Sequence, residues 1–424
     1  MPLTYYAEHV WLPAGVATGV LLEVTDGRFT GVRAVDAPPP DATRLPGLSM
    51  PGLANAHSHA FHRALRGRTQ GTGGSFWTWR TVMYEVAAAL DPDSYFQLAR
   101  AVYAEMALAG ITCVGEFHYL HHAPGGRPYA DPNAMGTALV AAAGEAGIRI
   151  TLLDACYLSS TVDGAALLPE QRRFGDGDAE RWAERVSRLA PPDHARVGAA
   201  VHSVRAVPEA QIPTVVAWAE QRGAPLHVHL SEQRAENEAS LEHSGRTPTE
   251  VLADTGVLGP RTTAVHATHV TDADRAALGD SGTGVCFCPT TERDLADGMG
   301  PARALVDGGS PLSLGSDSQA VIDLFEEARA VEMHERLRTE RRGHFSAGDL
   351  VDAATWQGHA ALGWPDAGRI AVGQRADLVT VSLTTPRTSG VDPAAAVFAA
   401  TCADVSQVLV DGRAVVRDGR AVRP

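Results

Sequence analysis

Short apolar runs alternate with longer stretches of helical periodicity through most of the chain. The runs have the length of buried strands and lie near residues 51–57, 110–117, 148–157, 196–202, 224–229, 262–267, 283–288 and 312–316. Between most of them, apolar residues recur at the spacing of an amphipathic helix, as over 93–108, 134–146, 179–189 and 208–221. Eight strands alternating with helices predict an α/β fold, a parallel sheet closed as a (β/α)8 TIM-type barrel, for which roughly 320 residues suffice.

An open, doubly wound sheet is the alternative arrangement of the same elements. The dinucleotide-binding version of that fold carries Gly-x-Gly-x-x-Gly directly after its first strand. No such string follows the first apolar run of this chain. The barrel is therefore favoured.

The two chain ends show a different pattern, of short strands separated by Gly- and Asp-containing turns. Strands are expected over 5–12, 20–25 and 29–35 at one end, and over 376–383 and 405–419 at the other. In the last of these, Asp411-Gly412 is typical of a hairpin turn. Because the N-terminal strands are too few to be stable alone, we predict a composite small β-sandwich domain from residues 1–49 and 370–424. Residues 50–369 would then form the barrel.

Polar residues that could bind a metal or take part in catalysis lie at the carboxyl ends of the predicted barrel strands. In order along the chain they are His57, His59, Glu116, His118, His202, His229, His266 and Asp317. In a barrel of this type the chemistry lies at that end of the strands. The sequence therefore predicts that these side chains meet.

Composition restricts the partners and the compartment. A net charge of −14 gives the surface an average field that does not attract nucleic acid or anionic membranes. Five cysteines do not make a disulfide framework and fit a reducing compartment, and Cys286 and Cys288 read as small core residues. No leader and no apolar run of transmembrane length is apparent, so a cytoplasmic protein is expected.

A metal site is the first chemistry that these residues predict. His57 and His59 would point to the same face of an extended strand. With His229 and Asp317 they supply three imidazoles and one carboxylate, a ligand set suited to Zn²⁺ with an open position for water, although iron and manganese also accept it. The alternative for Asp317 is to cap a helix expected over 320–338.

Acid–base groups are expected beside the metal. Glu232, three residues after His229, could shuttle protons to a leaving nitrogen, or could simply open a charged surface stretch over 232–242. His266 and His269 are both candidates for an electrophilic or acid–base role, and the spacing does not choose between them.

Together these motifs resemble the metal-dependent deaminases of the amidohydrolase superfamily, over nearly the whole chain. The motifs are Pro51-Gly-x4-His-x-His, His229-x-x-Glu232, the strand-six His266, and Gly315-Ser-Asp317. More specific strings are similar to those of the formimidoylglutamate deiminases of histidine degradation. They are Asn55-Ala-His-Ser-His-Ala-Phe, Phe76-Trp-Thr-Trp-Arg80, Gly115-Glu-Phe-His-Tyr119, His202-Ser-Val-Arg205, Pro289-Thr-Thr-Glu292 and Gly315-Ser-Asp-Ser.

That resemblance implies one zinc ion held by His57, His59, His229 and Asp317, with Glu232, His266 and Asp317 catalytic. It implies hydrolysis of N-formimidoyl-L-glutamate to N-formyl-L-glutamate and ammonia, by a homodimer. The implied substrate contacts are His62, where the family usually has Gln, Arg80, Tyr119, His202 and Arg205.

The charge of that substrate gives an independent check. A dianion bound by an acidic protein needs fixed cations, and arginine can grip a carboxylate with two parallel hydrogen bonds. From the residues alone, Arg80 could instead lie on the surface of a helix and Arg205 could form a loop ion pair.

Two other functions stay open: deamination of a nucleobase or other ring amine, and binding of a metabolite or partner by a barrel that has lost its activity.

Overall fold

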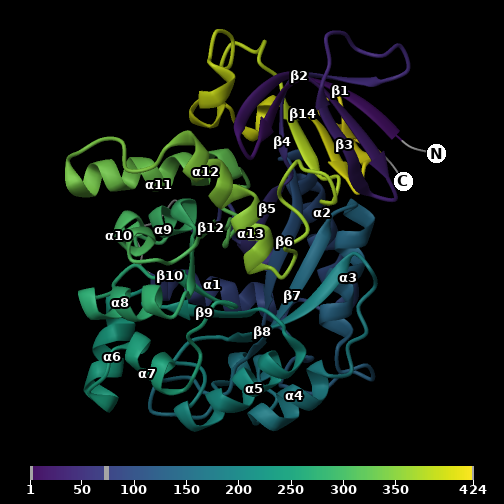
Figure 1. Cartoon of the computed structure of the whole chain (residues 1–424). Coiled ribbons are helices and arrows are strands. Elements are labelled where there is room, and N and C mark those ends of the chain that lie inside the picture. The colour runs from purple at the N-terminus through teal and green to yellow at the C-terminus, as the bar shows by residue number, and fades with distance from the viewer. Residues whose placement is uncertain (1–2, 71–75, 423–424) are drawn as a thin grey trace.

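A computed structural model describes residues 3–70 and 76–422 as a barrel with a second sheet beside it (Figure 1). The barrel sheet has the order β12-β11-β10-β9-β8-β7-β6-β5, and its described neighbours pair in parallel. Its strands are β5 (Leu53–Ser58), β6 (Ile111–His118), β7 (Arg149–Cys156), β8 (Ala195–Val201), β9 (Leu226–Leu230), β10 (Thr262–His266), β11 (Gly284–Phe287) and β12 (Leu312–Leu314). The predicted (β/α)8 fold is confirmed.

The ring of strands closes where the candidate metal ligands lie. A parallel bridge joins Ser58, at the end of β5, to Asp317, just past β12. The Asp317 amide donates to the carbonyl of His57 at 3.0 Å, and the His59 amide donates to the carbonyl of Asp317, also at 3.0 Å. Closure of the barrel therefore fixes the backbone of three of the predicted ligands together.

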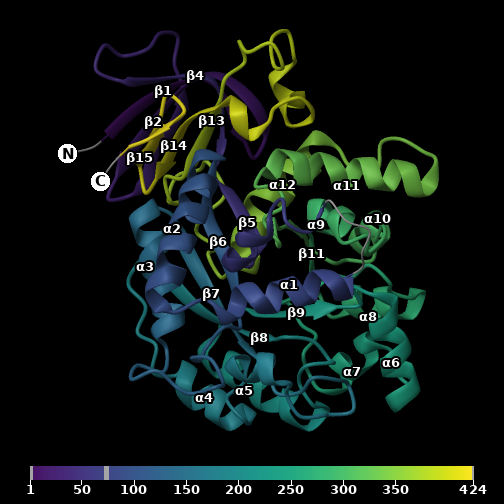
Figure 2. The ribbon, with the colours of Figure 1, turned by 180° about the vertical axis from the view of Figure 1, so that it is seen from behind.

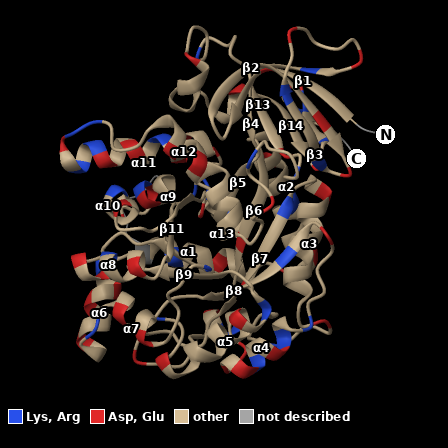
Figure 3. Ribbon diagram, in the orientation of Figure 1, with Lys and Arg blue, Asp and Glu red and all other residues tan. Residues whose placement is uncertain are grey.

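Helices surround the barrel and connect its strands. They are α1 (Phe76–Ala88), α2 (Pro92–Leu108), α3 (Ala134–Ala146), α4 (Ala179–Val186), α5 (Ile212–Arg222), α6 (Arg234–Ser244), α7 (Pro248–Asp254), α8 (Asp272–Asp280), α9 (Pro289–Asp294), α10 (Ala302–Asp307), α11 (Leu324–Thr339), α12 (Ala347–Ala354) and α13 (Trp356–Ala361). Seen from behind, α1 lies across the barrel near β9 (Figure 2). Charged residues of both signs are interspersed on the outer helices (Figure 3).

The second sheet draws strands from both chain ends, and both termini lie beside it (Figure 1). Its order is β16-β15-β14-β13-β4-β1-β2-β3. The strands are β1 (Leu3–Leu12), β2 (Gly15–Thr25), β3 (Arg28–Ala34), β4 (Thr43–Pro51), β13 (Leu378–Val381), β14 (Val405–Val410), β15 (Arg413–Arg417) and β16 (Arg420–Ala421). Asp411 and Gly412, both with positive φ, turn the β14–β15 hairpin as predicted. The sheet has its own apolar core, which includes Val10, Leu22 and Leu378.

A buried ion-pair network links the barrel to this sheet. Arg149, the first residue of β7, is 1% exposed and donates to the carboxylates of Asp377 and Asp411. The Asp411 amide also donates to Asp377 at 2.8 Å. Breaking a buried pair leaves an uncompensated charge out of water, which costs more than the lost attraction alone.

We therefore expect Arg149→Met to lower the free energy of unfolding by about 3–5 kcal/mol. Equilibrium denaturation in urea measures the change. Arg100→Met is the matched control, because Arg100 pairs with Glu145 where both side chains are 53% exposed, and such pairs contribute about 0–1 kcal/mol. Equal losses in the two variants would contradict the prediction.

The described chain shows no helix with the length and apolar character needed to cross a bilayer. All five cysteines are free. Cys286 and Cys288 are buried in a small cluster with Ala56 and Val265.

Candidate active site

Three histidines and one aspartate bring their side chains together at the carboxyl end of the barrel. The Nε2 atom of His229 lies 3.1 Å from Nε2 of His57 and 3.3 Å from Nε2 of His59. Oδ1 of Asp317 lies 3.5 Å from Nε2 of His57 and 3.4 Å from Nε2 of His59. Such separations are those of neighbouring ligands around a tetrahedral ion with bonds of about 2.0–2.2 Å.

The hydrogen bonds of these imidazoles leave their Nε2 lone pairs facing one another. His59 donates from Nδ1 to the carbonyl of Phe117 at 2.9 Å, and His229 from Nδ1 to the carbonyl of His202 at 2.9 Å. In a neutral imidazole with a proton on Nδ1, Nε2 is an acceptor. Burial lowers the pKa of His57 to about 3 and also lowers the pKa values of His59 and His229. Converging lone pairs and a carboxylate fit a divalent cation.

Asp317 is held by backbone contacts and does not cap a helix. The N-cap of α11 is Asp323, so the capping interpretation of Asp317 is wrong. Burial raises the pKa of Asp317, but the hydrogen bond and charge of His57 outweigh that effect and lower the pKa overall. Asp317 is therefore a carboxylate, with a left-handed φ of 44° held by barrel closure.

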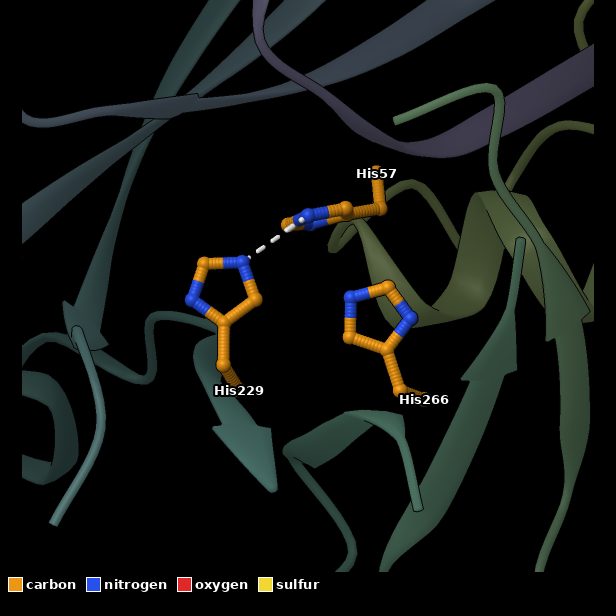
Figure 4. Close-up of side chains that lie close together, drawn as sticks. All are labelled: His57, His229 and His266. Carbon is orange, nitrogen blue, oxygen red and sulfur yellow. Dashed lines mark hydrogen bonds between the residues drawn. The ribbon is translucent and has the colours of Figure 1, made fainter. Parts of the chain in front are cut away.

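His266 joins the same group, whereas His269 does not. Figure 4 shows the rings of His57, His229 and His266 facing a common space. Nε2 of His266 lies 3.6 Å from Oδ2 of Asp317 and 3.9 Å from Oε1 of Glu232. His269 instead donates to the carbonyl of Asp297 at 2.8 Å. The structure thus identifies His266 as the strand-six histidine that faces the cluster.

Glu232 belongs to the site and not to an exposed charged stretch, because its Oε1 lies 3.9 Å from Nε2 of His266 and its side chain is only 13% exposed. Burial raises its pKa, while the charge of His266 opposes the shift. For His266 burial lowers the pKa, but the charge of Glu232 and the hydrogen bond to Glu292 outweigh it, and the pKa is raised well above its usual range. A carboxyl group with a raised pKa therefore lies beside an imidazole whose pKa is also raised.

A cavity of about 50 Å³ lies against this cluster. Of the site residues that the sequence predicts, all but His57 line it: His59, His62, Arg80, Tyr119, His202, Arg205, His229, Glu232, His266 and Asp317. His57 is fully buried. A second cavity of about 260 Å³ shares Arg80, Arg205, His229 and Glu232 with the first. Together they give a narrow reaction centre with an adjoining space.

The predicted substrate contacts also line the smaller cavity, some of them in direct contact with the cluster, as the rings of His59 and His62 are at a centroid distance of 4.5 Å. Arg80, on α1, donates to the hydroxyl group of Tyr157 at 3.4 Å and lies over the ring of Tyr84. Nε2 of His62 lies 2.9 Å from the hydroxyl oxygen of Tyr119. Arg205 lines both cavities. Two guanidinium groups and several tyrosine hydroxyl groups suit a ligand with more than one carboxylate.

Sequence reasoning assigned no role to several polar residues that support this site. Glu292 lies 3.4 Å from Nδ1 of His266, although Pro289-Thr-Thr-Glu292 stood out as a motif. Glu236 lines the larger cavity, and burial raises its pKa to about 7. Glu116 accepts from the Ser58 hydroxyl at 2.7 Å and from the Ala60 amide at 2.6 Å, on either side of His59. Only their contacts across the fold distinguish these acids.

His118 does not join the other strand-end side chains, contrary to the prediction: with His121 and Asp154 it forms a second buried group, and none of the three is among the described residues that line the cavity. Arg185 donates to both carboxylate oxygens of Asp154, at 2.9 and 2.7 Å, and the Trp182 indole donates to one of them. The charge of Asp154 is therefore already balanced by a guanidinium group. A cation added there would be repelled by Arg185.

Residues 48–415 match the model of the amidohydrolase family, and the chain belongs to that family. It is 39% identical to the formimidoylglutamate deiminase of Pseudomonas aeruginosa, over 98% of this chain and 95% of the relative. A solved amidohydrolase from Brucella melitensis superposes with a TM-score of 0.91 at 32% identity, over 99% of this chain and 96% of the other. An adenosine deaminase from Xanthomonas campestris, solved with bound zinc, gives 0.86 at 25% identity, over 99% and 94%.

Proposed function

We propose that this protein is a metal-dependent deiminase that hydrolyses N-formimidoyl-L-glutamate. Water and the substrate give N-formyl-L-glutamate and ammonia. The observation that carries the proposal is a pair of cavities that share Arg80, Arg205, His229 and Glu232, the smaller of which is also lined by His59, His266 and Asp317 of the cluster. The 39% identical Pseudomonas relative bears the name of this activity.

The proposed metal is a single zinc ion held by His57, His59, His229 and Asp317. The support is the separation of their donor atoms, the tautomers of His59 and His229, and the zinc named in the Xanthomonas structure. When bound, such an ion supplies a positive charge that acidifies water and polarises the carbon–nitrogen bond. The proposed oligomer is a homodimer, which light scattering of the purified protein would test.

The side chains of the protein then divide the proton transfers between them. Oδ2 of Asp317, turned toward His266, accepts a proton from the attacking water. Glu232 takes up a proton and returns it to the departing nitrogen, which leaves as ammonia. His266, whose Nε2 faces the same space, stabilises the tetrahedral intermediate formed at the formimidoyl carbon by a hydrogen bond to its oxygen.

The two arginines select the substrate by charge. Arg205 and Arg80 would each bind one carboxylate of the glutamate part, while the formimidoyl group enters the narrow cavity beside Glu232. Guanidinium groups match carboxylates in geometry as well as in charge. Deamination of a ring amine is the second candidate, since the Xanthomonas structure is named as an adenosine deaminase, but it does not need this pair of cations.

Ammonia release from a panel of substrates tests the function. We expect the highest kcat/KM with formimidoylglutamate, a lower value with formimidoylaspartate, and none detectable with guanine, cytosine or adenosine. Activity confined to a ring substrate would overturn the assignment. No bound metal and no ammonia from any compound would favour a binding protein.

Arg205→Leu should raise KM for formimidoylglutamate about 10- to 100-fold with kcat changed little, because a charged hydrogen bond contributes about 1.5–3 kcal/mol. Steady-state kinetics measures both constants. Arg234→Leu is the control, because Arg234 is exposed on α6. If Arg205→Leu leaves KM and kcat unchanged, Arg205 does not bind a carboxylate.

A further inference from the structure

His266 has a carboxylate on each side of its ring. On the cavity side, Nε2 faces Asp317 and Glu232 at 3.6 and 3.9 Å. On the far side, Nδ1 lies 3.4 Å from Oε1 of Glu292. Glu292 is absent from the described residues that line the cavity. It therefore touches the histidine from behind and not the space for the substrate.

Glu292 is itself held firmly. It lies in α9, which follows β11 directly, and is 2% exposed. Its Oε1 accepts a hydrogen bond from the Cys288 amide at 2.8 Å, and its own amide donates to the Cys288 carbonyl at 3.0 Å. One oxygen thus meets both the backbone of α9 and the ring of His266, so the carboxylate has little freedom to turn.

The backbone of His266 is held by contacts of its own. His266 and Ala267 have φ values of 71° and 47°, in the left-handed region that costs a non-glycine residue about 1–3 kcal/mol. The Ala267 amide is fixed by the carbonyl of Leu230 at 3.0 Å. These contacts hold the main chain, but they do not decide which ring nitrogen faces the cavity.

We propose that Glu292 is the positioning residue for His266. It accepts a hydrogen bond from Nδ1–H and so orients the ring with Nε2 toward the reaction centre. An acceptor behind an imidazole fixes its tautomer and orientation and stabilises its cation, the role of the aspartate in a Ser–His–Asp triad. The proposal rests on the proposed function for the reaction that His266 serves.

Glu292→Gln tests this role, because the amide keeps the size of the side chain and removes its charge. We expect kcat to fall about 10- to 100-fold, the usual effect of losing the partner behind a functional histidine. KM should stay within about threefold, and metal content should match the wild type, because Glu292 lines neither the cavity nor the ligand cluster.

Glu327→Gln is the matched control. Glu327 is fully buried on α11 and accepts hydrogen bonds from the amide and hydroxyl of Thr290, in the same helix as Glu292. It also loses a buried carboxylate, so thermal stability should fall, but kcat should stay within about threefold of wild type. An equal loss of kcat in both variants would show that Glu292 is merely structural.

A double-mutant cycle separates action through His266 from other effects. In a His266→Gln background, Glu292→Gln should cause no further loss of kcat. The same fold-loss in both backgrounds, or a kcat near wild type in the single variant, overturns the proposal. Should Glu292→Gln not fold, Glu292→Asp replaces it in the cycle. Wild-type protein without activity on formimidoylglutamate refutes the proposed function alone, and the cycle is then measured on the panel substrate that it hydrolyses.

Discussion

In Glu232→Gln, kcat for ammonia release from formimidoylglutamate should fall about 10²- to 10⁴-fold, the range expected for loss of a general acid–base group. Glutamine has nearly the same shape but cannot take up and return a proton. The Glu232 side chain lines the cavity and is 13% exposed, and burial raises the pKa of its carboxyl group. The variant therefore removes chemistry and leaves the cavity in place.

Metal content and KM distinguish this role from a structural one. Both should stay within about threefold of wild type, because Glu232 is outside the cluster of three histidines and Asp317. Steady-state kinetics and elemental analysis of the same preparation measure them. Glu238→Gln, the same change at an exposed position of α6, is the control. Loss of the metal from Glu232→Gln would show that Glu232 is a ligand and not an acid–base group.

The local periodicity of the sequence was enough to predict the barrel. Helix α3 has the predicted bounds, because Gly147 takes the left-handed conformation that ends a helix after Ala146. Helix α5 begins four residues later than predicted, after a short 3-10 turn over Glu209–Gln211. Strand β4 was missed as a separate element. It pairs with β1 and β13, from opposite chain ends, and leads into β5 almost without a break.

The sequence predicted part of the site in the same way, from the local pattern. Positions at strand ends identified His57, His229 and Asp317, because a barrel brings all such ends together. Contacts between loops were not predictable in this way. The clamp of Asp317 between the backbones of His57 and His59 depends on barrel closure. The contact of Glu292 with His266 joins residues 26 positions apart, and no spacing rule specifies it.

Removing the metal with a chelator should abolish ammonia release and lower the melting temperature, and added zinc should reverse both changes. Without a cation, three buried lone pairs and a carboxylate face one another within 3.1 to 3.5 Å. A ligand that binds only the folded state stabilises it by about 4 kcal/mol at a thousandfold excess over its Kd. Elemental analysis, kinetics and thermal melting follow the cycle of removal and return.

His229→Asn shows whether this cluster is the binding site. It removes one donor, so the variant should bind zinc far more weakly and lose activity at least 10³-fold. His227→Asn is the matched control on the same strand and face. Its Nε2 lies 3.0 Å from the carbonyl of Ala361, away from the cluster, so this variant should keep the metal. Removal of a true ligand must weaken metal binding more than removal of a buried histidine elsewhere on the strand. Full metal content in His229→Asn, or equal metal loss in both variants, would therefore show that the three histidines and Asp317 are not the ligand set.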